Sequence, residues 1–286
     1  MSQAKLKTAY VLSAIIAILM IMQSMGGLFL NGLYRDNTFV QSGWYGNDLV
    51  TLVVAAPLLV GALIFSIRGS PPAQLLWLGM LDYTLYNYAF YLFGAAFNSF
   101  FLIYLALFTL AIYALIFALV NIDVVAISQQ FQARTPIRWI SGYMVLWAVI
   151  LGGLWISESL NFIFTNQLPG IVVATAHPTN VVAILDLSLM VPAVLLGAIW
   201  LWKRQPWGYM LAAIMNVKGA VFALVLAVGS HVGATHGISG LTEQIPIWVF
   251  LSTASLLCCG FLLGNMKSKE KEERTKPHRS SSEQQV

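Results

Sequence analysis

Charged residues are scarce in this chain, and most of those present lie between long apolar stretches. Asp, Glu, Lys and Arg make up 9% of the 286 residues, and the mean hydropathy is +0.78. About 20 consecutive apolar residues in a helix cross a bilayer core. The sequence has eight stretches near that length and therefore predicts an all-α, polytopic membrane protein. The stretches lie at 8–30, 48–67, 74–96, 100–120, 139–158, 179–202, 208–229 and 245–264.

Cysteine is almost absent as well. Cys258 and Cys259 are neighbours in the last apolar stretch, where a helix points their side chains about 100° apart. This spacing supports neither a disulfide nor a zinc site. The sequence also contains no Walker, HExxH, GxSxG or nucleic-acid-binding motif. The pI of about 9.1 is therefore attributed to membrane topology, the lipid bilayer is the expected partner, and no cofactor is indicated.

The basic residues determine the expected orientation. With the N-terminus inside, 13 of the 15 lysines and arginines fall on the cytoplasmic side, as the positive-inside rule requires. Arg35 lies outside, and Lys218 lies within a span. Both termini are therefore expected in the cytoplasm, and the expected location is a bacterial plasma membrane. The polar, charged tail at 267–286 cannot bury a core and is expected to be disordered.

The two halves of the chain resemble each other at an offset of 135 residues. QSMGGLFLNGL at 23–33 aligns without a gap with ESLNFIFTNQL at 158–168, and the same offset pairs Pro57 with Pro192. A four-span unit returns to the side where it began, so two tandem copies share one orientation. We therefore expect two four-helix repeats related by a pseudo-two-fold axis along the membrane normal. The expected divisions are 1–138, 139–266 and the tail at 267–286.

Three ionisable residues, Asp82, Asp186 and Lys218, lie well inside the expected spans. A charge near the centre of a transmembrane helix costs about 2.5–3.5 kcal/mol on insertion scales, so these side chains should face the bundle interior. The 135-residue offset aligns Asp82 with Val217, next to Lys218, so we expect Asp82 and Lys218 to pair across the axis. Two carboxylates against one ammonium leave a negative charge for a proton or a cation to neutralise.

Polar and aromatic side chains near these charges suggest a small-molecule pocket. Pro57 and Pro192, mid-span in equivalent helices, free backbone carbonyls and permit the bends that a carrier needs. These features favour a carrier or ligand-binding bundle for a small solute, cation or proton. A structural or accessory protein, in which the same groups only fix helix packing, stays open. The predicted ligand-binding residues are Asp82, Tyr86, Asn87, Asp186, Asn216 and Lys218.

A second candidate site lies at the outer ends of the expected spans. Asp48 is expected to begin the second span and Glu158 to end the fifth, with histidines in the outer loops. Histidines and carboxylates that converge there could hold zinc or act as acid and base, which makes a membrane-embedded enzyme the alternative. The H-x4-H spacing is not that of a helical metal pair, so enzymatic activity is the less favoured hypothesis. This alternative set is Asp48, Glu158, His177, His231 and His236. The sequence indicates neither a substrate nor an oligomeric state.

Overall fold

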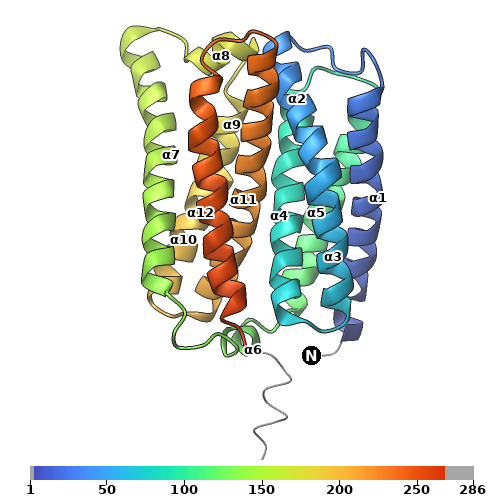
Figure 1. Ribbon diagram of the computed structural model, residues 1–286, viewed down its shortest axis with the longest axis vertical. Helices are drawn as coiled ribbons and strands as arrows, with labels where there is room; N and C mark the ends of the chain where they lie inside the picture. The colour runs from blue at the N-terminus through green and yellow to red at the C-terminus, as the bar shows by residue number, and fades with distance from the viewer. Residues whose placement is uncertain (1–2, 268–286) are drawn as a thin grey trace, which may run out of the picture.

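The computed structural model describes residues 3–267, and within this range the protein is all-helical apart from one isolated β-bridge, Phe131 to Met266. Long helices run side by side along one axis (Figure 1). The first half of the chain forms α1 (Lys7–Phe29), α2 (Thr38–Val50), α3 (Ala56–Ile67), α4 (Pro71–Gly94) and α5 (Phe101–Asn121). The second half forms α6 (Val124–Ser128), α7 (Ile137–Thr165), α8 (Gly170–Thr175), α9 (Val181–Leu185), α10 (Val191–Trp202), α11 (Pro206–Thr235) and α12 (Ile245–Gly264).

Seven helical stretches are long and apolar enough to cross a membrane, which fits the predicted multi-pass membrane protein; of the eight predicted spans, the one at 74–96 is not among these seven. The remaining long helix, α4, has 24 residues. It carries Asp82 among several tyrosines, so it is more polar than the seven apolar stretches. The seven stretches are Lys7–Phe29, Thr38–Ile67, Phe101–Asn121, Ile137–Thr165, Val181–Trp202, Pro206–Thr235 and Thr242–Gly264.

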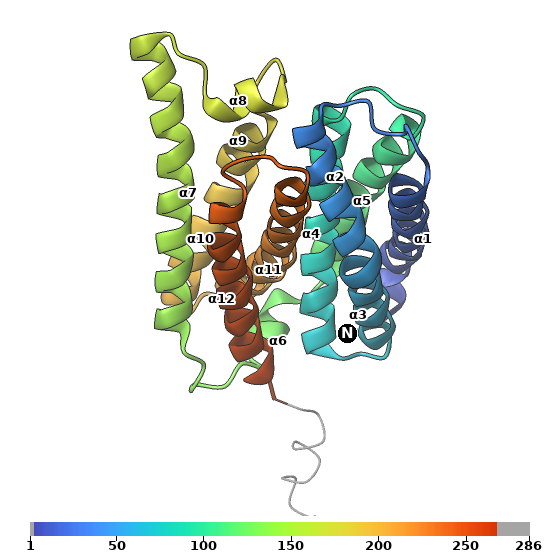
Figure 2. The same ribbon diagram turned by 45° about the horizontal axis from the view of Figure 1, so that its top comes forward.

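The long helices form two groups, one from each half of the chain (Figures 1 and 2). Helix α11 is the central element, because it packs against α10 and α12 of its own half and against α2 and α4 of the first half. A glycine pair permits the contact with α2. A Cβ atom on Gly46 would overlap the backbone of Gly229, so the two helices approach at a distance that larger side chains would prevent.

The second and sixth predicted spans are each interrupted by a π-helical segment. Thr51–Ala55 joins α2 to α3, and Asp186–Met190 joins α9 to α10. Pro57 and Pro192 follow as second residues of α3 and α10. Proline has no N–H to donate and crowds the preceding turn, so the helix widens there. Every boundary of the first π-helical segment and of α3 recurs 135 residues later.

The turns after α3 and α10 share one geometry. After α3, Ser70 N–H donates to Phe65 O at 3.0 Å; after α10, Gln205 N–H donates to Trp200 O at 2.8 Å. Both turns are Schellman motifs, which place one residue in the left-handed region. That residue is Gly69 (φ +81°) in the first turn and Arg204 (φ +56°) in the second.

Three predicted helix ends were wrong, each because the helix is longer than its apolar stretch. Helix α2 begins at Thr38, where Asn37 caps it by accepting a hydrogen bond from Val40 N–H at 3.0 Å. Asp48 therefore lies inside that helix and does not begin it. Glu158 lies inside α7, which continues to Thr165, and His231 lies inside α11 rather than in the following loop.

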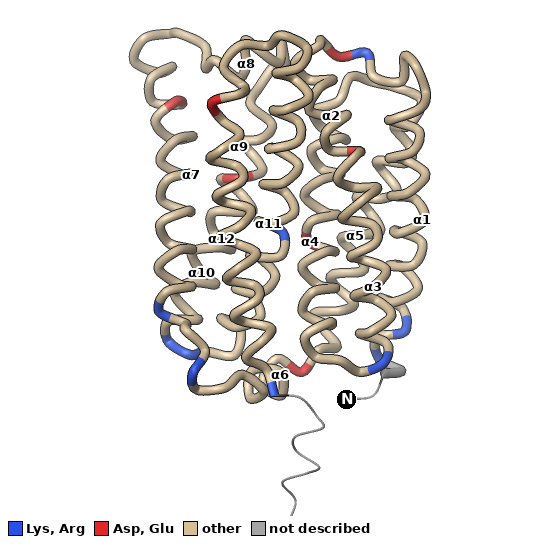
Figure 3. The backbone as a smooth tube through the Cα atoms, viewed as in Figure 1, with Lys and Arg blue, Asp and Glu red and all other residues tan. Residues whose placement is uncertain are grey.

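Basic residues gather at the end of the bundle that carries α6, which we call the α6 end; the opposite end, which carries α8, is the α8 end (Figure 3). The linker between the halves lies at the α6 end and pairs with the end of α12, because Lys267 N–H donates to Gln130 O at 2.8 Å. The predicted disordered tail, apart from Lys267, lies outside the described residues.

Candidate functional site

Two of the charges predicted inside the bilayer lie together between the halves. Lys218 Nζ on α11 is 3.8 Å from Asp82 Oδ2 on α4. The Lys218 side chain is 3% exposed, and that of Asp82 is 19% exposed. The same ammonium lies over the ring of Tyr86, 3.9 Å from its centroid, in a cation–π contact. The expected pairing of Asp82 with Lys218 inside the bundle is therefore confirmed.

Asp186 is joined to this pair through Tyr86. Its Oδ1 atom accepts a hydrogen bond from the Tyr86 hydroxyl at 2.6 Å, and its Oδ2 atom accepts one from Trp155 Nε1 at 2.8 Å. Tyr86 thus donates to one carboxylate and places its ring beneath the ammonium that faces the other. We call Asp82, Tyr86, Asp186 and Lys218 the interface cluster. Asp186 is the first residue of its π-helical segment, a helix distortion that is common at functional sites.

The hydrogen bonding of the interface cluster is incomplete. The buried Oδ2 atom of Asp82 has no hydrogen-bond partner among the described residues. Neither does Oδ1 of Asn216, which lies two residues before Lys218 and whose Nδ2 donates to Ala212 O in its own helix. A buried polar atom without a partner costs about 1–3 kcal/mol, and native proteins retain few of them. The two carboxylates and one ammonium of the cluster leave it with a formal negative charge. This charge and the unpaired acceptor oxygens both favour the binding of a proton or a small cation.

Asn87, the remaining predicted residue, contacts α2 instead of the cluster. Its Oδ1 atom accepts a hydrogen bond from Asn47 Nδ2 at 2.6 Å. Thr51 continues this network, since its Oγ1 atom lies 3.2 Å from Asn47 Oδ1 and 3.0 Å from the Tyr83 hydroxyl. Of the six predicted residues, four therefore form the interface cluster. In residues 3–267 no hydrogen bond joins Asn87 or Asn216 to those four.

Asp48 has a separate site in the first half. Its side chain is fully buried, and its Oδ1 atom accepts hydrogen bonds from Gln23 Nε2 and the Tyr91 hydroxyl, each at 2.8 Å. Its Oδ2 atom accepts from the hydroxyl of Tyr34, in the loop after α1. Burial, together with the Asp48 carboxylate, raises the pKa of Tyr34 far above its ordinary value, so this phenol stays protonated and donates. A Cβ atom on Gly27 would overlap this carboxylate, so any larger residue there would have to displace Asp48.

The other residues of the alternative set do not gather around a shared centre. Within residues 3–267, no group of three or more His, Cys, Asp or Glu side chains is arranged to hold a metal ion. His236 Nδ1 lies 2.8 Å from Val232 O of the preceding turn. Glu158 and His177 each have a buried atom with no hydrogen-bond partner among the described residues, but no hydrogen bond links them to Asp48.

Trp155 and Gln23, which donate to Asp186 and Asp48 respectively, were not predicted from the sequence. Gln23 carries a usable signal, since an amide within an apolar span requires a polar partner. The Trp155 indole gives no such signal, because tryptophan is common at membrane interfaces whatever it bonds. Comparisons of this chain with protein-family models, with curated proteins and with solved structures find no match.

Proposed function

We propose that this protein is a membrane carrier that binds a proton or a small cation at the interface cluster, between two four-helix units. The observation that carries this proposal is the incomplete ion pair. Asp82 Oδ2 is buried, stays 3.8 Å from the Lys218 ammonium and accepts no hydrogen bond from a described residue. A group that must bind and release an ion needs this unused acceptor capacity.

The hydrogen bonding of Asp48 shows how a buried carboxylate with a structural role differs from Asp82. Asp48 is also a carboxylate buried in the bundle, yet three donors, Gln23, Tyr34 and Tyr91, complete its hydrogen bonding. This is the arrangement expected of a carboxylate that only fixes helix packing. Asp82 lacks such donors, which favours a carrier over a structural or accessory protein.

The helix boundaries support the duplicated architecture that we propose for the carrier. The starts of α4 and α11, Pro71 and Pro206, differ by 135 residues, as do the boundaries of α3 and α10. Helix α4 is proposed as the eighth span, because its 24 residues extend about 36 Å. Its polar residues are explained if they face the rest of the bundle. The repeats then correspond to 1–138 and 139–266, and the basic α6 end is the cytoplasmic side.

The position of the interface cluster suits alternating access. Asp82 and Tyr86 belong to the first half, whereas Asp186 and Lys218 belong to the second. Rotation of one half against the other would change every contact in the cluster together, and the π-helical segments provide places where the helices can bend. Neutralising one carboxylate by a proton or cation would weaken its hold on Lys218 and so favour the other arrangement.

The proposal is tested by ion-specific stabilisation and flux. Purified full-length protein is heated in nonionic detergent with LiCl, NaCl or KCl, with choline chloride as the ionic-strength control. The same preparation is reconstituted into liposomes that contain a pH-sensitive dye, with and without a gradient of each cation. Asp82→Asn and Asp186→Asn are compared with Asp123→Asn, a matched control, because Asp123 caps α6 and asparagine caps equally well.

We expect the parent and the Asp123→Asn control to show either stabilisation by one of these cations or proton flux into the liposomes. Asp82→Asn and Asp186→Asn should both lose whichever of these two effects the parent shows. If the parent shows neither stabilisation nor flux above empty liposomes, the carrier proposal is wrong and the structural alternative is favoured. Equal behaviour of the parent and both cluster variants would also overturn the assignment of the site.

A further inference from the structure

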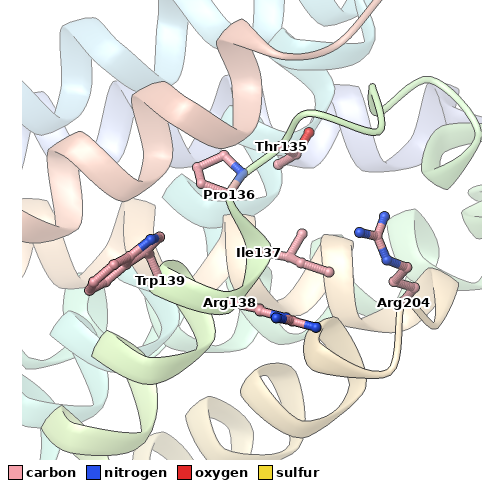
Figure 4. A pocket seen from close by; sticks show the side chains of 6 residues that line it. All are labelled: Thr135, Pro136, Ile137, Arg138, Trp139 and Arg204. Carbon is pink, nitrogen blue, oxygen red and sulfur yellow. The ribbon is translucent and has the colours of Figure 1, made fainter.

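A hollow of about 270 Å³ opens at the α6 end, away from the interface cluster (Figure 4). Two elements form it: the start of α7 and the turn between α10 and α11. Arg138 lines it from α7 and Arg204 from the turn, so two arginines from different elements border one hollow. The lining residues are Thr135, Pro136, Ile137, Arg138, Trp139 and Arg204.

Arg204 occupies an unfavourable backbone position. It is the left-handed residue of its Schellman motif, where glycine is the usual residue, and the corresponding turn after α3 has Gly69 there. A side chain with a Cβ atom is disfavoured at this φ. An arginine at this position therefore costs stability, and a role for its side chain explains why the turn carries arginine instead of glycine.

The charge of the hollow is not balanced by the described residues. The ion pair found between residues 3 and 267 is that of Lys218 with Asp82, so neither Arg138 nor Arg204 has a carboxylate partner there. Helix α7 begins at the hollow with no acidic residue in its first turn, so its N–H groups add further positive potential. Two arginines that border one hollow repel each other, and an anion bound there would offset this repulsion.

We propose that this hollow binds the phosphate of an anionic lipid headgroup. Arginine binds phosphate through two parallel hydrogen bonds, and two arginines on different elements can hold one phosphate from two sides. Trp139 favours lipid as the source of the phosphate, because it directly follows Arg138 in α7 and is 84% exposed, and exposed tryptophans are common at membrane interfaces. This inference is independent of the carrier function.

The test uses full-length protein in dodecylmaltoside and measures the thermal midpoint against added dioctanoyl-phosphatidylglycerol. Dioctanoyl-phosphatidylcholine and sodium phosphate are the comparison ligands. The variants are Arg138→Gln and Arg204→Gly, and the matched control is Arg68→Gln, an arginine that caps α3 and does not line the hollow. Arg204→Gly is the sharpest variant, because glycine suits φ +56° and the fold should be no less stable without lipid.

We expect phosphatidylglycerol to stabilise the parent and Arg68→Gln, and to bind each hollow variant roughly tenfold more weakly, since each loses charge-assisted hydrogen bonds. Without lipid, Arg204→Gly should have a midpoint equal to or above that of the parent. Equal binding of phosphatidylglycerol by all variants would refute the site. Equal stabilisation by phosphatidylcholine, or by sodium phosphate at the same concentration, would refute the anionic lipid as the ligand.

Discussion

Removal of the Lys218 charge tests the energetics of the interface cluster. In Lys218→Met the apolar part of the side chain is largely retained, and the ammonium that faces Asp82 at 3.8 Å is lost. A buried charge without its partner costs about 3–5 kcal/mol. The cation–π contact with Tyr86, 3.9 Å from ammonium to ring centroid, is lost as well and contributes about 0.5–2 kcal/mol. Because the Asp82 side chain is 19% exposed, we expect a total loss near the lower limit, about 3 kcal/mol.

The double variant Asp82→Leu/Lys218→Met separates the cost of a stranded charge from the contribution of the pair. Replacing both members of a buried ion pair by apolar residues of similar volume is often neutral, so we expect stability within about 1 kcal/mol of the parent. Stability is measured by reversible unfolding in mixed micelles of dodecylmaltoside and increasing SDS, followed by far-ultraviolet circular dichroism. Lys203→Met, an exposed lysine at the α6 end, is the control and should change stability by less than about 0.5 kcal/mol.

A double variant that loses as much stability as Lys218→Met, or more, would refute this reasoning. The ion pair would then be a net stabilising contact that serves helix packing rather than binding. A loss below about 1 kcal/mol in Lys218→Met alone would show that Asp82 finds another partner or is already protonated.

Three further predictions use the same unfolding assay. Gly27→Ala should destabilise by about 1–3 kcal/mol, because its Cβ would overlap the Asp48 carboxylate, whereas Gly43→Ala, with open space around its Cβ, should be neutral or stabilise by up to about 1 kcal/mol. Equal losses would contradict this packing. Tyr34→Phe removes a donor to Asp48 and should cost about 1.5–3 kcal/mol, and no loss would show that water replaces the phenol. Trp155→Phe should cost a similar amount through the interface cluster, and a neutral result would mean that its 2.8 Å hydrogen bond is dispensable.

Much of the architecture could be predicted because it depends on local properties of the chain. An apolar stretch in a bilayer must satisfy its own backbone groups, so its length and composition predict a helix. The mid-span prolines likewise predicted the two distorted helices. The ends of α2, α7 and α11 could not be predicted from hydropathy, since polar segments such as TFVQSGWYGN continue a helix when a cap like Asn37 starts it.

The candidate site was predicted in part. The cost of a charge in lipid was enough to select Asp82, Asp186 and Lys218 and to require that they face inward. It could not select the neutral donors, because Trp155 and Tyr91 belong to residue types with many other roles in membrane proteins. Nor could it exclude Asn87, which differs from Tyr86 by one position in the helix and so faces α2 instead of the second half.

The sequence by itself therefore determined that the chain forms several helices long and apolar enough to cross a membrane, and it identified the charged residues that are buried among them. Only the tertiary structure decided which polar groups meet. That decision depends on how each helix is rotated about its axis and how closely it approaches its neighbours. Contacts such as that of Gly46 with Gly229, and of Gly79 with Val217, set these distances. They join residues more than 100 positions apart, so no local sequence pattern predicts them.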